Sequence, residues 1–280
     1  MEAPHPSPQM CANPSPLPTT KEHLPTTTRD IRVENYVTRL TEVLRGELKD
    51  VLAAVYLFGS AGYGAYESGT SDIDVCAVVH EPLSDYRRIA QKINATAIPC
   101  PSHKLEFLLL STHNAAHPSP IIKFEMNLVT GKDIDDQLSL DCSAEPRFWF
   151  LLDIAMGREL GKTFYGPAPQ KLLARPKQEW IVDCLIESLA WYRGHLPVTH
   201  EGVLNACREL RFVQTGKWGS KMDGCRWVIQ HYDRPDIVVL ASHARRSGSA
   251  IPQEEALDFL SFAEKEVKEL GMGADVEGLS

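Results

Sequence analysis

The strongest constraint on the fold is an apolar run that ends at a glycine and is followed by two aspartates at alternate positions. Residues 51–58 are apolar throughout and end at Gly59. A run of this length closed by glycine is typical of a buried strand that leads into a tight turn. After a polar segment, Asp72 and Asp74 open a β-branched run that continues to Val79. We therefore expect two strands joined by a glycine turn, with polar side chains where the second strand begins.

The neighbouring segments complete a sheet covered by helices. Apolar residues recur at helical spacing over residues 31–48 and 83–96, and a third strand-like run covers residues 104–110. This order predicts a small mixed sheet with helices packed against it. We expect residues 121–129 to add an edge strand. Residues 29–145 are thus predicted to form an α/β (α+β) domain.

The rest of the chain is predicted to be helical or disordered. Amphipathic helices are expected over residues 148–160, 179–193, 202–215, 221–231 and 254–270. These helices predict an all-α bundle as a second domain over residues 146–280. Residues 1–28 are rich in proline, serine and threonine, a composition that neither forms a helix nor buries a core, and we expect a disordered leader.

The charge balance indicates the class of partner. The formal charge of −8 argues against broad nucleic-acid binding, which needs lysine and arginine in excess on one face, and suits a small cationic ligand. The pair Arg245-Arg246 is interpreted as a solvated pair at a helix end. No apolar run approaches the roughly 20 residues of a membrane span, and the seven cysteines form no CxxC pair. We expect a cytoplasmic monomer without nucleic-acid or membrane partners.

The glycine turn and the aspartates together fit the demands of nucleotidyl transfer. Gly59 allows the chain to approach a bound ligand closely, and Ser60 is expected at a helix N-terminus, where amides and hydroxyls bind phosphate. Asp72 and Asp74 lie two residues apart, so both carboxylates point to one face of a strand. Paired carboxylates with open coordination positions suit Mg²⁺ that also binds phosphate.

A third acid is placed to join this pair. Glu106 interrupts the apolar run 104–110, where an unpaired buried carboxylate would be costly. If this strand lies beside Asp72 and Asp74, Glu106 completes the metal site or accepts the proton of an acceptor hydroxyl. The alternative is a glutamate on an edge strand that faces water.

These residues resemble the signature of the DNA polymerase β-type nucleotidyltransferase superfamily. The second half of the chain resembles the aminoglycoside 3''(9)-adenylyltransferases, which modify streptomycin and spectinomycin. The residues that carry this second resemblance are Arg208, Thr215-Gly216-Lys217, Lys221, and Tyr165-Gly166-Pro167. The resemblance implies ATP as co-substrate and Mg²⁺ as cofactor.

The resemblance also implies roles for single residues. Asp72 and Asp74, with Glu106, would hold Mg²⁺, and Glu106 would be the catalytic base. The nucleotide would be bound by Gly59, Ser60, Ser71, Arg208 and Lys221. Trp191 would line the acceptor pocket. Two alternatives stay open at this point. The alternative for Arg208 and Lys221 is a solvated charge on a helix face, and the alternative for Trp191 is packing in the core.

Two departures from that family leave the reaction class intact and the acceptor open. The loop between Gly64 and Ser71 is longer by one residue, and the segment between Trp191 and Arg208 is shorter and lacks a run of acids. The leading hypothesis is Mg²⁺-dependent transfer of AMP from ATP to a hydroxyl of a small aminoglycoside- or aminocyclitol-like compound. The alternatives are a protein or other acceptor, and a catalytically inactive nucleotide-binding regulatory module.

Overall fold

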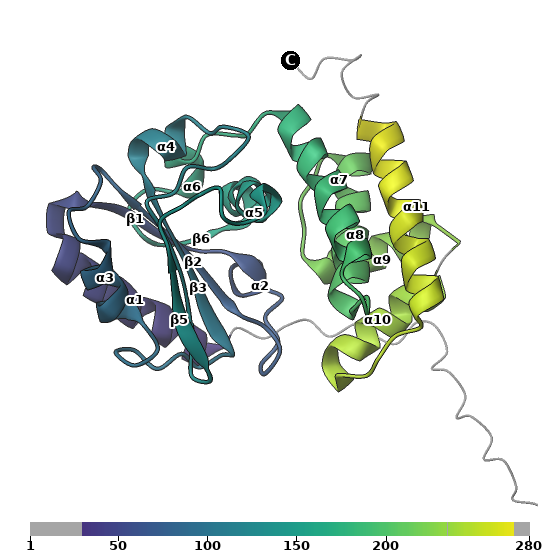
Figure 1. Cartoon of the computed structure of the whole chain (residues 1–280), viewed down its shortest axis with the longest axis horizontal. Coiled ribbons are helices and arrows are strands. Elements are labelled where there is room, and N and C mark those ends of the chain that lie inside the picture. The colour runs from purple at the N-terminus through teal and green to yellow at the C-terminus, as the bar shows by residue number, and fades with distance from the viewer. Residues whose placement is uncertain (1–29, 234, 272–280) are drawn as a thin grey trace, which may run out of the picture.

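The computed structural model describes residues 30–233 and 235–271, and the predicted leader lies outside these residues. A sheet with flanking helices is followed by a helical bundle (Figure 1). In the first part the helices are α1 (Ile31–Leu48), η1 (Lys49–Val51), α2 (Gly59–Gly62), α3 (Tyr86–Ile93), α4 (Thr112–Ala116), α5 (Arg147–Leu160) and α6 (Pro169–Leu172). The strands are β1 (Leu52–Leu57), β2 (Ile73–Val79), β3 (Lys104–Ser111), β4 (Met126–Gly131), β5 (Ile134–Ser139) and β6 (Lys162–Tyr165). The bundle contains α7 (Gln178–Gly194), α8 (His200–Thr215), α9 (Lys221–His231), α10 (Pro235–Ser247) and α11 (Gln253–Gly271).

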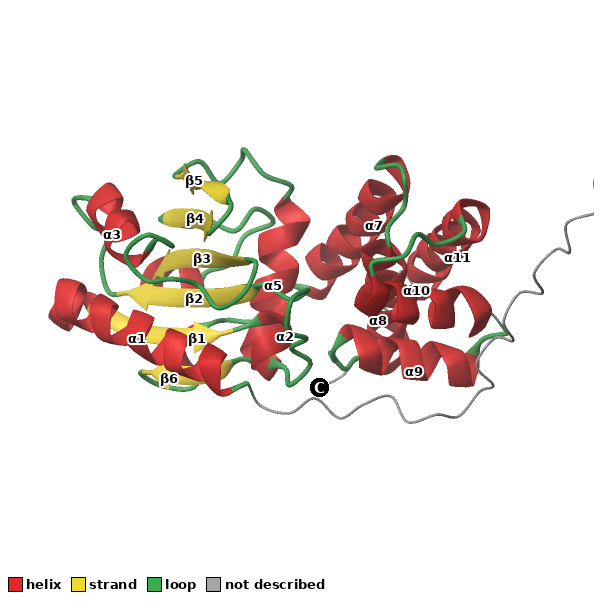
Figure 2. Ribbon diagram, turned by 90° about the horizontal axis from the view of Figure 1, so that it is seen from below, coloured by secondary structure: helices red, strands yellow, loops and turns green. Residues whose placement is uncertain are grey.

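The six strands form one mixed sheet in the order β5-β4-β3-β2-β1-β6, which Figure 2 shows from top to bottom. Strands β2 and β3 are parallel, and every other pair is antiparallel. A parallel pair needs a crossover, and α3 supplies it. The predicted mixed sheet with packed helices is therefore confirmed.

The prediction about the sheet edge needs correction, and the other edge strand was not predicted. The expected edge strand over residues 121–129 is β4, which lies inside the sheet because β5 pairs with its outer side. The other edge is β6, which pairs with β1 and which the strand patterns did not predict. Its four residues are too few to show a period of two.

Side chains that alternate along the central strands face two different cores. Val75, Ala77 and Val79 pack with α1 and α3 on one face. Cys76 and Val78 pack on the other face with α5, in a cluster that continues into the bundle helices. The second face is therefore covered by α5, and its core continues into the helical bundle.

The predicted boundary near residue 145 divides elements that pack together. Helix α5 covers the sheet, and β6, which follows it, completes the sheet. We propose that the boundary between the two domains lies after α6, which packs against α4 and α5, in the segment that leads to α7 at Gln178. No described helix combines the length and the hydropathy that crossing a bilayer demands.

The five helices predicted for the second half are present, and α10 is an additional one. Helix α10 packs against α8 and α9. Its apolar periodicity is no weaker than that of α7 and α9, so the sequence signal for this helix was available. This helix carries Arg245.

Candidate active site

Two paired strands bring the predicted carboxylates together. In the parallel register of β2 and β3, Asp74 lies opposite Glu106. Asp72 lies directly before β2, and its charge contributes to the raised pKa of Asp74. Strand β3 is internal, so the alternative of an edge-strand glutamate is wrong. The Glu106 side chain nevertheless keeps 39% of its surface exposed, which leaves it accessible to a ligand.

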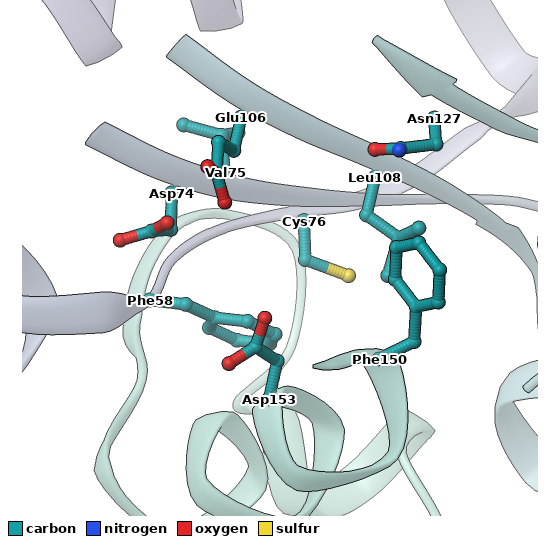
Figure 3. A pocket seen from close by; sticks show the side chains of 9 residues that line it. All are labelled: Phe58, Asp74, Val75, Cys76, Glu106, Leu108, Asn127, Phe150 and Asp153. Atoms are coloured by element: carbon teal, nitrogen blue, oxygen red, sulfur yellow. The ribbon is translucent and has the colours of Figure 1, made fainter. Parts of the chain in front are cut away.

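A fourth carboxylate, Asp153, approaches from α5. Figure 3 shows Asp153 projecting from the helix toward Asp74 and Glu106, which project from the sheet. The three acids line a pocket together with Phe58, Val75, Cys76, Leu108, Asn127 and Phe150. The sequence analysis missed Asp153. The signal was available, since Asp153 interrupts an apolar run as Glu106 does.

Burial and mutual repulsion raise the pKa values of Asp74 and Asp153. Burial is the main cause for Asp74, and the charges of Glu106 and Asp153 add to it. Burial also raises the pKa of Asp153 to about 7, with a further contribution from Glu106. The charges of Arg208 and Lys221 oppose this rise. Positive charge added to the pocket would therefore reduce the electrostatic repulsion among these carboxylates.

This electrostatic cost predicts that Asp153→Asn stabilises the free protein at neutral pH. An acid whose folded pKa is raised to about 7 stabilises the fold below its ordinary value near 3.8 and loses that contribution as the pH rises through 7. At pH 8 we expect the variant to melt roughly 5 °C higher than the parent, from about 2 kcal/mol. At pH 4.5 we expect nearly equal Tm values, because Asp153 is then mostly protonated. Thermal melts at both pH values test this, and an equal gain at the two would contradict it.

Lys104 is the cation already present among the carboxylates. Its ammonium lies 3.5 Å from an Asp72 carboxylate oxygen and donates a short hydrogen bond to Glu106. The pKa of Asp72 is raised by burial, and Lys104 opposes the rise. The imidazole of His103 also approaches Asp72, at 3.5 Å. Lys104 lies two residues before Glu106 on the same strand face, and the sequence analysis did not consider it.

The acids suit Mg²⁺ by their chemistry, but they do not yet form a coordination shell. Within residues 30–233 and 235–271, no three Asp, Glu, His or Cys side chains are gathered closely enough to hold a metal ion. The predicted ligand set of Asp72, Asp74 and Glu106 therefore stays a prediction. Hard carboxylate oxygens are the donors that Mg²⁺ prefers, and Asp74 is a buried acid with a raised pKa. Binding would require Lys104 to leave Glu106.

Gly59 lies directly against Asp74. Its φ of +56° is in the left-handed region, and a Cβ on Gly59 would fall 1.6 Å from the Asp74 Oδ2 atom. The amide of the preceding residue, Phe58, donates to the Asp74 carbonyl at 2.8 Å. Ser60 follows in the first turn of the short helix α2, and its contact with a phosphate stays a prediction. The glycine therefore sets how closely the turn and the carboxylate approach.

Ser71 has a different environment from the one predicted. It is 4% exposed, and its hydroxyl accepts hydrogen bonds from the Glu67 amide at 3.0 Å and from Arg245 at 3.2 Å. This hydroxyl is used inside the protein, so its nucleotide contact stays a prediction. Arg245 is 6% exposed, so the interpretation of Arg245-Arg246 as a solvated pair is wrong for Arg245 and holds only for Arg246.

The bundle presents two cations toward the acids. Arg208 on α8 donates to the Asn205 side-chain oxygen at 2.6 Å, and its buried Nε has no hydrogen-bond partner. Lys221, at the start of α9, forms an ion pair with Glu201 and is 23% exposed. Both charges oppose the raised pKa of Asp153, so they act on the carboxylates across the two parts of the chain. They are therefore not simple solvated helix-face charges.

Trp191 lies in an aromatic cluster on the bundle. Its ring stacks on His195 with centroids 4.0 Å apart and meets Tyr192 and Trp149 edge to face, at 5.0 and 5.9 Å. This packing agrees with the alternative of a core role. Contact between Trp191 and an acceptor stays a prediction.

Comparison with known proteins agrees with this geometry. Residues 38–127 match the family model described as nucleotidyltransferase domain, a range that contains the glycine turn, both aspartates and Glu106. The chain contains a nucleotidyltransferase domain. No curated protein matches the sequence.

Two solved structures describe the similarity further. Spectinomycin adenyltransferase AAD(9) from Enterococcus faecialis, solved with ATP and spectinomycin, shares 20% identity over 84% of this chain and 99% of its own, with a TM-score of 0.63. At this identity the likeness establishes a shared fold, including the helical second part. A toxin-antitoxin solved with AMP-PNP shares 18% identity over 56% of this chain and 88% of its own, with a TM-score of only 0.27.

Proposed function

We propose that this nucleotidyltransferase moves AMP from ATP to a hydroxyl of a small cationic acceptor of the aminoglycoside or aminocyclitol type. The observation that carries the proposal is the pairing of β2 and β3, which sets Glu106 beside Asp74 next to the glycine turn at Gly59. The family match covers the same residues. The acidic pocket favours an acceptor that carries positive charge.

In the proposed reaction the acceptor oxygen forms a bond to the α-phosphorus of ATP, and the bond to the β-phosphate oxygen breaks, so that pyrophosphate leaves. Glu106 takes the proton of the acceptor hydroxyl. Its 39% exposure allows it to reach a substrate, and it becomes available as a base once Lys104 moves away. Asp72 and Asp74 would hold Mg²⁺, which neutralises triphosphate charge and orients the α-phosphate.

Arg208 and Lys221, whose charges act on Asp153 from the bundle, have a matching role in the proposal. Cations that approach the phosphates from a second domain stabilise the charge that develops on pyrophosphate. Arg208 keeps an unpaired Nε donor for this purpose. Lys221 must first exchange Glu201 for a phosphate oxygen. The proposal therefore makes closure of the two domains a condition of activity.

The test is pyrophosphate release from ATP and Mg²⁺, with streptomycin and spectinomycin supplied separately. We expect release that depends on one of the drugs, together with a mass gain of one AMP on that drug. A protein-sized labelled product after incubation with labelled ATP and cell extract would point to the alternative acceptor class. Mg²⁺-ATP binding without release under any of these conditions would favour an inactive regulatory module and contradict the proposal.

A further inference from the structure

Arg245 is a buried charge that joins the bundle to the loop before the metal-site aspartates. Its Nε lies 3.1 Å from a Glu67 carboxylate oxygen in an ion pair, although this N–H is not aligned for a hydrogen bond, and its terminal nitrogen donates to the Ser71 hydroxyl at 3.2 Å. Arg245 belongs to α10 of the bundle, whereas Glu67 and Ser71 belong to the segment between α2 and β2. The side chain thus makes polar contacts with two residues of the other domain at once.

Ser71 is hydrogen-bonded to Glu67, across the loop that ends directly before Asp72. Its hydroxyl accepts from the Glu67 amide at 3.0 Å, and its own amide donates to the Glu67 carbonyl at 2.9 Å. Its carbonyl accepts a hydrogen bond from the Ser102 hydroxyl, in the loop that leads to β3. A displacement of Ser71 would therefore be passed directly to the next residue, Asp72.

Arg245 is also within electrostatic reach of the phosphate side of the site. Burial would raise the pKa of Glu201, but the charge and hydrogen bond of Lys221, the hydrogen bond of His200 and the charge of Arg245 lower it. One arginine thus contacts the loop before Asp72 and acts on the Glu201–Lys221 pair. These are the two places from which the triphosphate would be held.

We propose that Arg245 is a positioning residue that ties α10 to Glu67 and Ser71, so that the docking of the bundle fixes the place of Asp72. The proposal rests on the nucleotidyl transfer proposed above. Arginine suits this role because its planar guanidinium presents several donors in fixed directions, whereas lysine offers a single point charge. Burial of the guanidinium requires both partners, because an unpaired buried charge is costly.

The test compares three substitutions of the contact with one control. Arg246 is the matched control, because it is the next residue on α10 and is exposed. In Arg245→Ala and Glu67→Gln we expect kcat to fall ~30-fold, since a misplacement of about 1 Å in an active site costs as much as 100-fold. We expect the dissociation constant of Mg²⁺-ATP to change less than about threefold. Arg245→Lys should recover part of kcat, and Arg246→Ala should match the parent.

The double variant Arg245→Ala with Glu67→Gln tests whether the two residues act through one contact or contribute to kcat independently. If the two residues act through one contact, the double variant loses no more kcat than the worse single variant. Losses that multiply would overturn the proposal, as would a Glu67→Gln variant with the kcat of the parent. Glu67 is 31% exposed, so its substitution tests the contact even if Arg245→Ala fails to fold.

Hydrogen exchange supplies a readout that needs no transfer activity. Amides of residues 67–72 should exchange faster in Arg245→Ala and in Glu67→Gln than in the parent, with no change in Arg246→Ala. If the parent protein shows no transfer with any acceptor, the proposed function fails while this measurement still judges the contact. Unchanged exchange in both contact variants would overturn the positioning role even in an active enzyme.

Discussion

Asp74→Asn is expected to lower nucleotidyl transfer by at least ~10³-fold while the protein stays folded. The amide keeps the shape of the side chain but removes the negative charge that would hold Mg²⁺, and electrostatic groups of this kind contribute several kcal/mol to the transition state. Pyrophosphate release with saturating ATP, Mg²⁺ and acceptor is the measurement. Retained activity would remove Asp74 from the site.

The same substitution should not destabilise the metal-free protein. Burial and the charges of Glu106 and Asp153 raise the pKa of Asp74, so its ionised form opposes folding at neutral pH. We expect the Tm of Asp74→Asn at pH 7.5 to equal or exceed that of the parent. Asp135→Asn is the matched control, because Asp135 is exposed on the edge strand β5 of the same sheet. The control should keep both activity and Tm.

The sequence predicted the parts of the site that depend on local periodicity. A spacing of two residues places Asp72 and Asp74 on one face wherever the strand lies. Glu106 was predicted because a carboxylate in an apolar run needs a polar partner or ligand. Both arguments use only the chain near each residue, and in the structure the pairing of β2 with β3 places Asp74 opposite Glu106. The geometry of a single strand is therefore enough to predict which of these side chains share a face.

The remaining parts depend on contacts between distant segments. Asp153 acquires its role only when α5 packs over the sheet, and its sequence context alone does not name the face that it meets. Arg245 is 174 residues from Ser71, and two adjacent arginines near a helix end give no sign that one is buried. The strand β6 depends on pairing with β1 rather than on its own four residues. Tertiary structure therefore decided these features.

Gly59→Ala is expected to separate catalysis from stability, and Gly64→Ala is its matched control. Both glycines have a positive φ, +56° and +70°, so alanine at either position costs about 1 kcal/mol through the left-handed backbone. The two sites differ in what a methyl group would meet. A Cβ on Gly64 would meet no atom within 4 Å apart from its chain neighbours, whereas a Cβ on Gly59 would lie 1.6 Å from the Asp74 Oδ2.

The clash at Gly59 involves the end of the Asp74 side chain. Rotation of this side chain relieves the clash, and the backbone can keep its conformation. We therefore expect the two alanine variants to melt within a few degrees of each other. Transfer activity should fall ~100-fold or more in Gly59→Ala and little in Gly64→Ala, because only the first displaces a carboxylate of the site.

Thermal melts and pyrophosphate release measure the two effects. Equal activities in the two variants would show that the approach of Gly59 to Asp74 does not matter for the chemistry. A large loss of Tm confined to Gly59→Ala would show instead that the turn itself cannot accept a side chain.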